Sequence, residues 1–169
     1  TGGALEAPGE PVPPGVLSAL GLSVEGVGND DPWAITEESE GRRLAFAKWV
    51  ANERNPLTAR AFVNRIWQHH FGQAIAGNPN NLGASGKKPT HPELLDWLAA
   101  DFIENGWTLK RLHRLIMTSG TYLQASHHPE REYIAAEDPN NKLLAYFPIR
   151  RLTAEEMRDS FLSVTGELE

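Results

Sequence analysis

The residues best suited to chemistry are six histidines, three of which lie between Asn55 and Trp107. His69 and His70 are adjacent, so on a helix their side chains point about 100° apart and cannot easily bind one metal ion together. The sequence has no HExxH motif and no pair of histidines four residues apart, which is the usual helical pattern for zinc. We therefore predict no metal ligands, with a zinc site built from distant His, Asp and Glu residues as the open alternative.

The other histidines have structural interpretations. His70 lies on an apolar helical face and is predicted to be a buried, hydrogen-bonded core residue. His113 borders an apolar stripe and is expected at an edge between helices. His127 and His128 stand in a polar loop and are expected to be solvated.

A second group of candidates consists of polar side chains that could bind a ligand. Four of them form a polar ridge at helical spacing, and three more lie at or just before the start of the next predicted helix, where backbone N–H groups favour anions. The stretch GASGKKPT at 83–90 is not a phosphate loop, because Lys88 stands where that motif needs Ser or Thr. The alternative is a solvated loop and a helix face of ion pairs. The candidate binding residues are Arg60, Asn64, Arg65, His69, Lys87, Lys88 and His91.

No residue is assigned a catalytic role. The carboxylate pairs, such as Glu93 and Asp96, have helical surface spacing that ion pairing explains. An arginine cluster near the C-terminus, which includes Arg150 and Arg158, is either a structural ion-pair device or the lining of a site for a carboxylate, phosphate or sugar. The sequence leaves open whether the chain is an enzyme, and the absence of a catalytic motif favours a non-catalytic role.

These candidates must be positioned by helices, because the apolar residues recur at three- and four-residue spacing and no alternating run of useful length is present. The fold class is predicted to be all-α, an orthogonal bundle of about five to six helices with an irregular Gly/Pro-rich N-terminal arm. Apolar side chains expected to face inward include Phe62, Leu123 and Phe161. Helices are expected at about 38–53, 57–71, 90–105, 109–124 and 138–147, and after Thr153.

Helix ends carry the strongest local signals. Asn55-Pro56 ends one helix and starts the next, and Gly72 is suited to a left-handed C-terminal cap. Capping boxes are predicted at Thr90 to Glu93 and at Thr153 to Glu156, and Thr108 is expected to cap a further helix. The glycine-rich loop from Gly72 to Pro89 is long for a structureless connection, so it is predicted to be a functional or strapping loop.

Composition limits the class of protein. The 169 residues fit one folded domain, and no apolar run has the roughly 18 residues that a membrane-spanning helix needs. No cysteine is present, which excludes disulfides and thiolate chemistry. The formal net charge is −6 and the pI is about 5.5, whereas nucleic-acid-binding domains usually have a pI above about 9. Nucleic acid is therefore not expected as a partner.

Charge and composition also divide the chain. Residues 1–41 contain eight acids and no Lys or Arg, and Gly and Pro are frequent in this part. We predict an extended acidic arm or linker at 1–37 and a helical domain at 38–169. Apolar residues of the arm are expected to dock partly on the body, which is mildly basic, and they are Val12, Val16, Leu17, Leu20, Leu22 and Trp33.

Three stretches carry a resemblance to a known family. They are GRRLAFAKWVANERNPLTARAFVNRIWQHHFG, NLGASGKKPTHPELLDWLAADFIENGWTLKRLHRLIMTSGTYLQAS and DPNNKLLAYFPIRRLTAEEMRDSFLSVTGEL. From about Gly41 to Leu168 the chain resembles the uncharacterised C-terminal domain of large planctomycete-type secreted proteins that often also carry a cytochrome-c-like domain. It departs from that pattern at Gln73–Ala76, where Arg-Gly-Leu-Val is usual, and at Asn80-Asn81, where acids are common.

The resemblance implies a larger exported parent protein, located in the periplasm or at the cell surface, and it implies no particular activity. No CxxCH motif is present, so we expect no cofactor in this chain and place any haem elsewhere in the parent. The start at Thr1 fits a piece of a longer protein. We expect a non-catalytic structural or interaction module whose partners are neighbouring domains of the parent polypeptide. The alternative is part of an enzyme or ligand-binding site for polysaccharide or another anionic or polar substrate.

Overall fold

The computed structural model describes residues 9, 14–24, 33–35 and 41–168 of the chain. In this described part the secondary structure is helical, with two isolated β-bridges and no β-strand, as an all-α fold requires. The predicted helix start near residue 38 lies outside the described residues. The elements are η1 Ser18–Leu20, α1 Arg42–Val50, α2 Pro56–Phe71, α3 Pro92–Glu104, α4 Leu109–Met117, α5 Arg131–Glu137 and α6 Ala154–Thr165.

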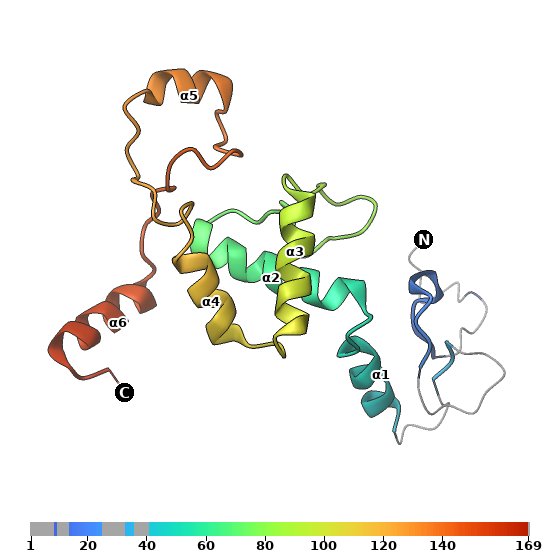
Figure 1. Cartoon of the computed structure of the whole chain (residues 1–169). Helices are drawn as coiled ribbons and strands as arrows, with labels where there is room; N and C mark the ends of the chain where they lie inside the picture. Colours follow the sequence, from blue (N-terminus) through green and yellow to red (C-terminus); the bar gives the residue numbers. More distant parts are fainter. Residues whose placement is uncertain (1–8, 10–13, 25–32, 36–40, 169) are drawn as a thin grey trace.

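The core lies where α2 packs against α3 and α4 (Figure 1). Its side chains come mostly from the predicted apolar faces, and Ile75 joins them from the loop after α2. Phe62, which was expected to face inward, is instead 51% exposed and stacks on Phe102. Aromatic rings at the end of α2 extend this core toward the segment after α4. The fully buried set is Ala59, Val63, Ile66, Trp67, Phe71, Ile75, Leu95, Leu98, Ala99, Phe102, Leu112 and Ile116.

Both ends of α2 follow the predicted signals. The side chain of Asn55 accepts a hydrogen bond of 3.0 Å from the backbone N–H of Leu57, and Pro56 is the first helical residue. Gly72 ends the helix with a φ of 75°, a left-handed conformation that disfavours any residue with a Cβ atom. Local chemistry therefore determines where this helix begins and ends.

The capping box predicted at the start of α3 is wrong. The first residue outside the helix is His91, and no side chain caps the helix there. The hydroxyl group of Thr90 instead donates to the carbonyl oxygen of Ile75 at 3.3 Å, and the backbone N–H of Thr90 donates to the same oxygen. Thr90 is therefore used to close the preceding loop, and burial of the apolar stripe stabilises α3 in place of the cap.

The next helix is shorter than predicted. Helix α4 begins after Thr108, as expected, although the Thr108 side chain makes no capping hydrogen bond and donates to the carbonyl of Asn105 instead. The helix ends at Met117, because the hydroxyl of Ser119 donates to Ile116 and accepts from the N–H of residue 122, which forms a turn. Leu123 is consequently 71% exposed, and its predicted burial is wrong.

The helix predicted at 138–147 is also wrong. The helix in this region is α5, Arg131–Glu137, which begins within the stretch SHHPEREY at 126–133 that was expected to be a loop. Residues 138–147 are irregular, since the buried side chain of Asn141 donates to Tyr146 and accepts from Ala145. Asn141 and Leu144 both have positive φ angles, of 46° and 54°. Side-chain hydrogen bonds to the backbone have replaced the helical pattern here.

A second, smaller apolar cluster joins α1 to described residues of the arm. Leu22, Val24 and Ile35 are buried with Trp49, whose indole N–H donates to the carbonyl of Leu22 at 2.8 Å. The expected docking of the arm is therefore seen for Leu22, whereas Leu17 is 59% exposed. Val16 and Leu20 are partly buried against the cluster, and Val12 lies outside the described residues.

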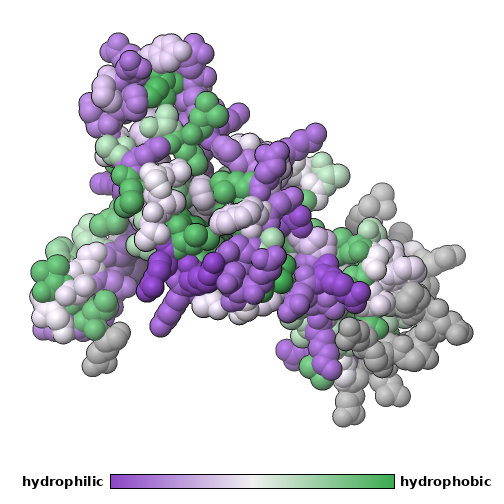
Figure 2. Space-filling model, in the orientation of Figure 1, coloured by the Kyte–Doolittle hydropathy of each residue, from purple (hydrophilic) through white to green (hydrophobic). Residues whose placement is uncertain are grey.

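Helix α6 differs from the rest because none of its residues is buried. It projects from the side of the core opposite to α1 (Figure 1). Phe161 is 66% exposed and Met157 is 48% exposed, so the expectation that Phe161 faces inward is wrong. Hydrophobic atoms are visible on the surface of this lobe (Figure 2). Its local structure is nevertheless well defined by its cap.

Candidate functional site

The polar ridge of α2 is mostly engaged in structural contacts. Asn64 is fully buried, and its amide donates to the carbonyl of Ala76 at 3.1 Å and accepts from the N–H of Ala76 at 2.8 Å. Arg60 forms an ion pair of 2.6 Å with Asp96 of α3, which lowers the pKa of that carboxyl. Both residues join α2 to its neighbours and leave little of their polar surface for a ligand.

The long loop between α2 and α3 is closed at its base. Besides the Asn64 contacts, the backbone N–H of Thr90 donates to Ile75, and an isolated bridge pairs Ala76 with Pro89. Gly86 permits the tight turn, because a Cβ atom at this position would lie 2.0 Å from the carbonyl oxygen of Asn81. Both ends of the loop are therefore held to the core by hydrogen bonds, and we call this loop the strap. A strapping role was one of the two roles that the sequence predicted for it.

The cationic candidates near this strap contact the strap itself or are exposed. Arg65 donates to the side-chain oxygen of Asn80 at 2.9 Å. The methylene groups of Lys87 lie against Gly77, and Lys88 is exposed. These contacts tie the strap to α2 and to itself.

His69 and His91 line two different hollows. His91 borders a mostly apolar one of about 250 Å³ between α3, α4 and residues 143–144. Trp97, on its wall, is 55% exposed. Nδ1 of His91 lies 3.0 Å from the hydroxyl oxygen of Thr90. His69, in the last turn of α2, borders a separate hollow, so these two predicted binding residues do not share one hollow.

The hollow beside His69 is also lined by His70, whose imidazole contacts a second histidine behind the wall. Nε2 of His70 lies 2.8 Å from Nδ1 of His113, which joins α2 to α4. A contact this short needs one N–H and one lone pair, so the two imidazoles share a single proton along it. The ring of Tyr122 packs edge-on against His70, with the centroids 5.6 Å apart.

The charge state of this pair follows from its surroundings. Burial is the largest cause that lowers the pKa of His70, because it disfavours the charged imidazole. Nearby positive groups lower it further, and these are His113, His69 and Arg150. His70 is therefore held toward its neutral form.

The remaining wall of the hollow comes from the segment that leads to α6. Phe147, Pro148, Ile149 and Leu152 are apolar, and Arg150 and Ser126 are the polar members of this side. We name this space of about 340 Å³ the histidine hollow, lined by His69, His70, Tyr122, Ser126, Phe147, Pro148, Ile149, Arg150 and Leu152.

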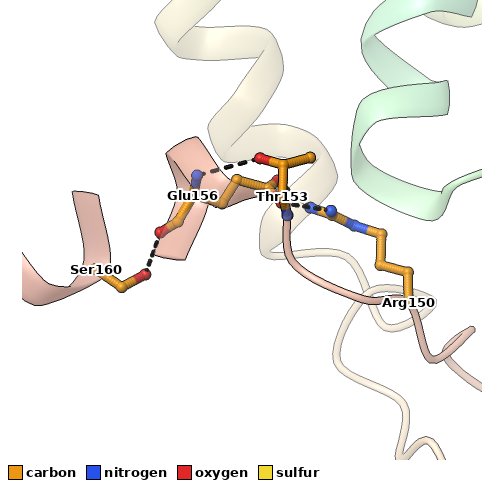
Figure 3. Close-up of polar contacts among 4 residues, drawn as sticks. All are labelled: Arg150, Thr153, Glu156 and Ser160. Atoms are coloured by element: carbon orange, nitrogen blue, oxygen red, sulfur yellow. Dashed lines mark hydrogen bonds and ion pairs between the residues drawn. The ribbon is translucent and has the colours of Figure 1, made fainter. Parts of the chain in front are cut away.

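Arg150 connects the histidine hollow to α6 (Figure 3). Its two terminal nitrogens donate to the carboxylate of Glu156 at 2.8 and 2.5 Å, and the carboxylate also accepts from the N–H of Thr153. These bonds, that of Arg150 first, lower the pKa of Glu156 to about 2. The hydroxyl of Thr153 accepts in turn from the N–H of Glu156, which completes the predicted capping box.

Sequence reasoning missed the histidine pair, although it expected His70 to be hydrogen-bonded and His113 to lie at an edge between helices. His70 is only partly buried, so its predicted full burial is wrong. The available signal was that His70 and His113 each lie on a helical face that packs on the other helix. Which residues of the two faces meet depends on how the helices cross, and that is a tertiary property. In the described part of the chain no cluster of three or more His, Asp or Glu side chains could hold a metal ion, and no helix there is long and apolar enough to cross a membrane.

Comparisons with known proteins give one result. Residues 42–169 match the model of a family described as PSD1, protein of unknown function (DUF1553). No curated protein and no solved structure matches the chain significantly.

Proposed function

The chain belongs to the DUF1553 family of proteins of unknown function, and from this premise we propose that it is a non-catalytic helical module that docks on a neighbouring domain of a larger exported bacterial protein. The observation that carries this proposal is the uncovered apolar face of α6. That face is formed by Met157, Phe161 and Val164, which are 48%, 66% and 89% exposed. Their spacing of four and three residues places them on one side of the helix.

A short helix has little stability of its own while its apolar face is exposed to water. Isolated helices shorter than about 12–15 residues are marginal in water, and most helical stability in proteins comes from packing an apolar face. Helix α6 has 12 residues and no buried residue, whereas its capping box and the ion pair to Arg150 fix its start. An apolar face on a well-started helix is typical of an interaction surface.

The size of this face favours a covalently linked neighbour over a second copy. Three side chains can bury at most about 500 Å² on one partner, and a standard interface buries about 800 Å² on each. A domain in the same polypeptide has a high effective concentration, so a smaller surface is sufficient to hold it. The resemblance to large secreted proteins supports the same choice and extends the proposal to a periplasmic or cell-surface location.

The alternative of an enzyme or ligand site along the α2 ridge has less support. That hypothesis needs Arg65, His69 and His91 around one opening. His69 and His91 border separate hollows, and Arg65 is bonded to the strap. A ligand site in this region would therefore include only part of the polar ridge of α2.

Hydrogen exchange tests the docking proposal directly. The amides of α6 should exchange at least about tenfold more slowly in the parent polypeptide than in this chain alone, because docking opposes local opening. Phe161→Ser in the parent should remove most of that difference, whereas Leu123→Ser, at an exposed residue outside α6, should not. Equal exchange of α6 in the parent and in the isolated chain would refute docking. If the amides of α6 instead become protected as the concentration of the isolated chain rises, the docking partner is a second copy of the chain and not a neighbouring domain.

A further inference from the structure

We propose that the histidine hollow binds a small organic carboxylate and takes up a proton with it. The inference does not depend on the docking proposal, because none of the three side chains of the α6 face lines the hollow. It rests on three features of the described residues: an imidazole pair, a cationic surrounding and an apolar wall.

The first feature is the charge around His70. The charged groups that act on it from the described chain are His113 of α4, His69 of α2 itself and Arg150 of the segment before α6. All of these groups are cationic when charged. The neutral ring of Tyr122 also packs edge-on against His70. An anion in the hollow would relieve this repulsion, because an opposite charge within a few ångströms favours the charged imidazole.

The second feature is the proton capacity of the imidazole pair. At 2.8 Å, one added proton gives a charged donor and a neutral acceptor, which strengthens the existing hydrogen bond. A second proton would place two N–H groups against each other. The pair is therefore suited to take one proton from solvent when an anion enters and to return it when the anion leaves.

Arg150 offers less positive charge to a ligand than an unpaired arginine would. Both of its terminal nitrogens are occupied by Glu156, so that carboxylate neutralises the guanidinium. The net charge offered to a ligand must then come mainly from the imidazoles. This is why binding should depend on pH in the range where histidines titrate.

The apolar wall determines the class of anion. Phe147, Ile149 and Leu152 face the hollow with Pro148, and its volume of about 340 Å³ lies at the lower end of the range for small-molecule sites. Inorganic anions would leave this wall in contact with water. A carboxylate with an aromatic or aliphatic body uses both sides of the hollow.

Calorimetry with benzoate on this chain tests the proposal. Between pH 7.5 and pH 6 the association constant should rise by up to about tenfold per pH unit, since binding is linked to uptake of one proton. Titrations in buffers of different ionisation enthalpy should show that uptake directly. Benzamide, which has the same shape without the charge, should bind without pH dependence and at least about tenfold more weakly at pH 6.

A second measurement needs no substitution. The pKa of His70, followed by the NMR shifts of its ring, should rise by about one unit when benzoate saturates the chain. Inorganic phosphate and chloride at the same ionic strength should raise it much less. A pKa of His70 that is unchanged by benzoate would overturn the proposal, and so would an equal response to chloride.

Variants assign the effect to the hollow. His70→Gln can keep a hydrogen bond to His113 but cannot become charged, so the pH dependence of benzoate binding should be at least halved, with the imidazoles of His69 and His113 still present. His69→Gln should weaken binding at pH 6 by about threefold, and the matched control His127→Gln, an exposed histidine outside the hollow, should leave binding unchanged. If His127→Gln weakens binding as much as His69→Gln, or if His70→Gln retains the full pH dependence of the unchanged chain, the site is elsewhere and the proposal is wrong.

Discussion

Helices α3 and α6 are nearly equal in length and opposite in what stabilises them. Helix α6 starts with a complete capping box and has no buried residue. Helix α3 has no side-chain cap and buries Leu95, Leu98, Ala99 and Phe102. Local hydrogen bonds can therefore specify where a helix starts without fixing it to the fold, whereas burial can hold a helix whose predicted cap is used elsewhere. The two helices respond differently to substitution, and this difference can be measured.

The largest expected difference comes from removing the same ring from each helix. Phe102→Ala in α3 should lower the free energy of unfolding by about 3–5 kcal/mol, because it leaves a cavity in the core. Phe161→Ala in α6 should change it by less than about 0.5 kcal/mol, since that ring is exposed. Denaturant titration measures both. Equal losses would mean that α6 is packed in the isolated chain, and the contrast between the helices would be wrong.

The strap before α3 should be nearly as sensitive. Asn64→Ala removes both hydrogen bonds to Ala76 and leaves a buried N–H and C=O unpaired, at a cost on the order of 2–4 kcal/mol. It should also make the loop at 77–88 more susceptible to limited proteolysis. The control is Asn80→Ala, which removes an exposed contact to Arg65. If both variants are cleaved at the same rate, the buried asparagine does not hold the strap.

A smaller effect is expected from the cap of α6. Thr153→Ala should destabilise this helix locally by about 1 kcal/mol, because the N–H of Glu156 loses its acceptor. The loss should appear as faster amide exchange within α6 and leave the unfolding midpoint of the core unchanged. Thr108→Ala at α4, where the threonine makes no capping bond, should have less effect on the exchange of its own helix. If Thr108→Ala accelerates amide exchange in α4 more than Thr153→Ala does in α6, the hydrogen-bond pattern does not predict the capping strength.

The smallest effect is the acid response of the same cap. The pKa of Glu156 is lowered from 4.5 to about 2, first by Arg150 and then by the N–H of Thr153. A lowered carboxyl pKa contributes stability that is complete above pH 4.5 and is lost as the pH falls toward 2. Amide exchange in α6 should therefore accelerate over that range. In Glu156→Gln this pH-dependent step should be absent, and its persistence would assign it to another group.

Several parts of the fold could be predicted because their causes are local. The helical class, the α2 boundaries at Asn55, Pro56 and Gly72, and the capping box at Thr153 depend on residues within one turn of each other. Predictions failed where a side chain had a choice of partners. Thr90 bonds to Ile75 in place of its own helix, and Asn141 bonds to Ala145 and so prevents the helix expected there.

The candidate site shows the same division. His69 borders the histidine hollow, and its binding role stays a prediction, whereas Arg60 and Asn64 contact α3 and the strap. The amino-acid types could not separate these roles, because an arginine on a helix face suits an ion pair as well as a ligand. The deciding fact was which residue of α3 or the strap lies opposite each one.

By itself, the sequence determined the helical class, both ends of α2, the starts of α4 and α6 and most of the apolar faces that build the core, because these follow from spacing and from contacts within a few residues. The tertiary structure alone decided that His70 meets His113, that Asn64 holds the strap, and that α6 keeps its apolar face uncovered. Each of these depends on how elements distant in the chain cross or fail to meet, and side-chain patterns along one helix do not specify that geometry.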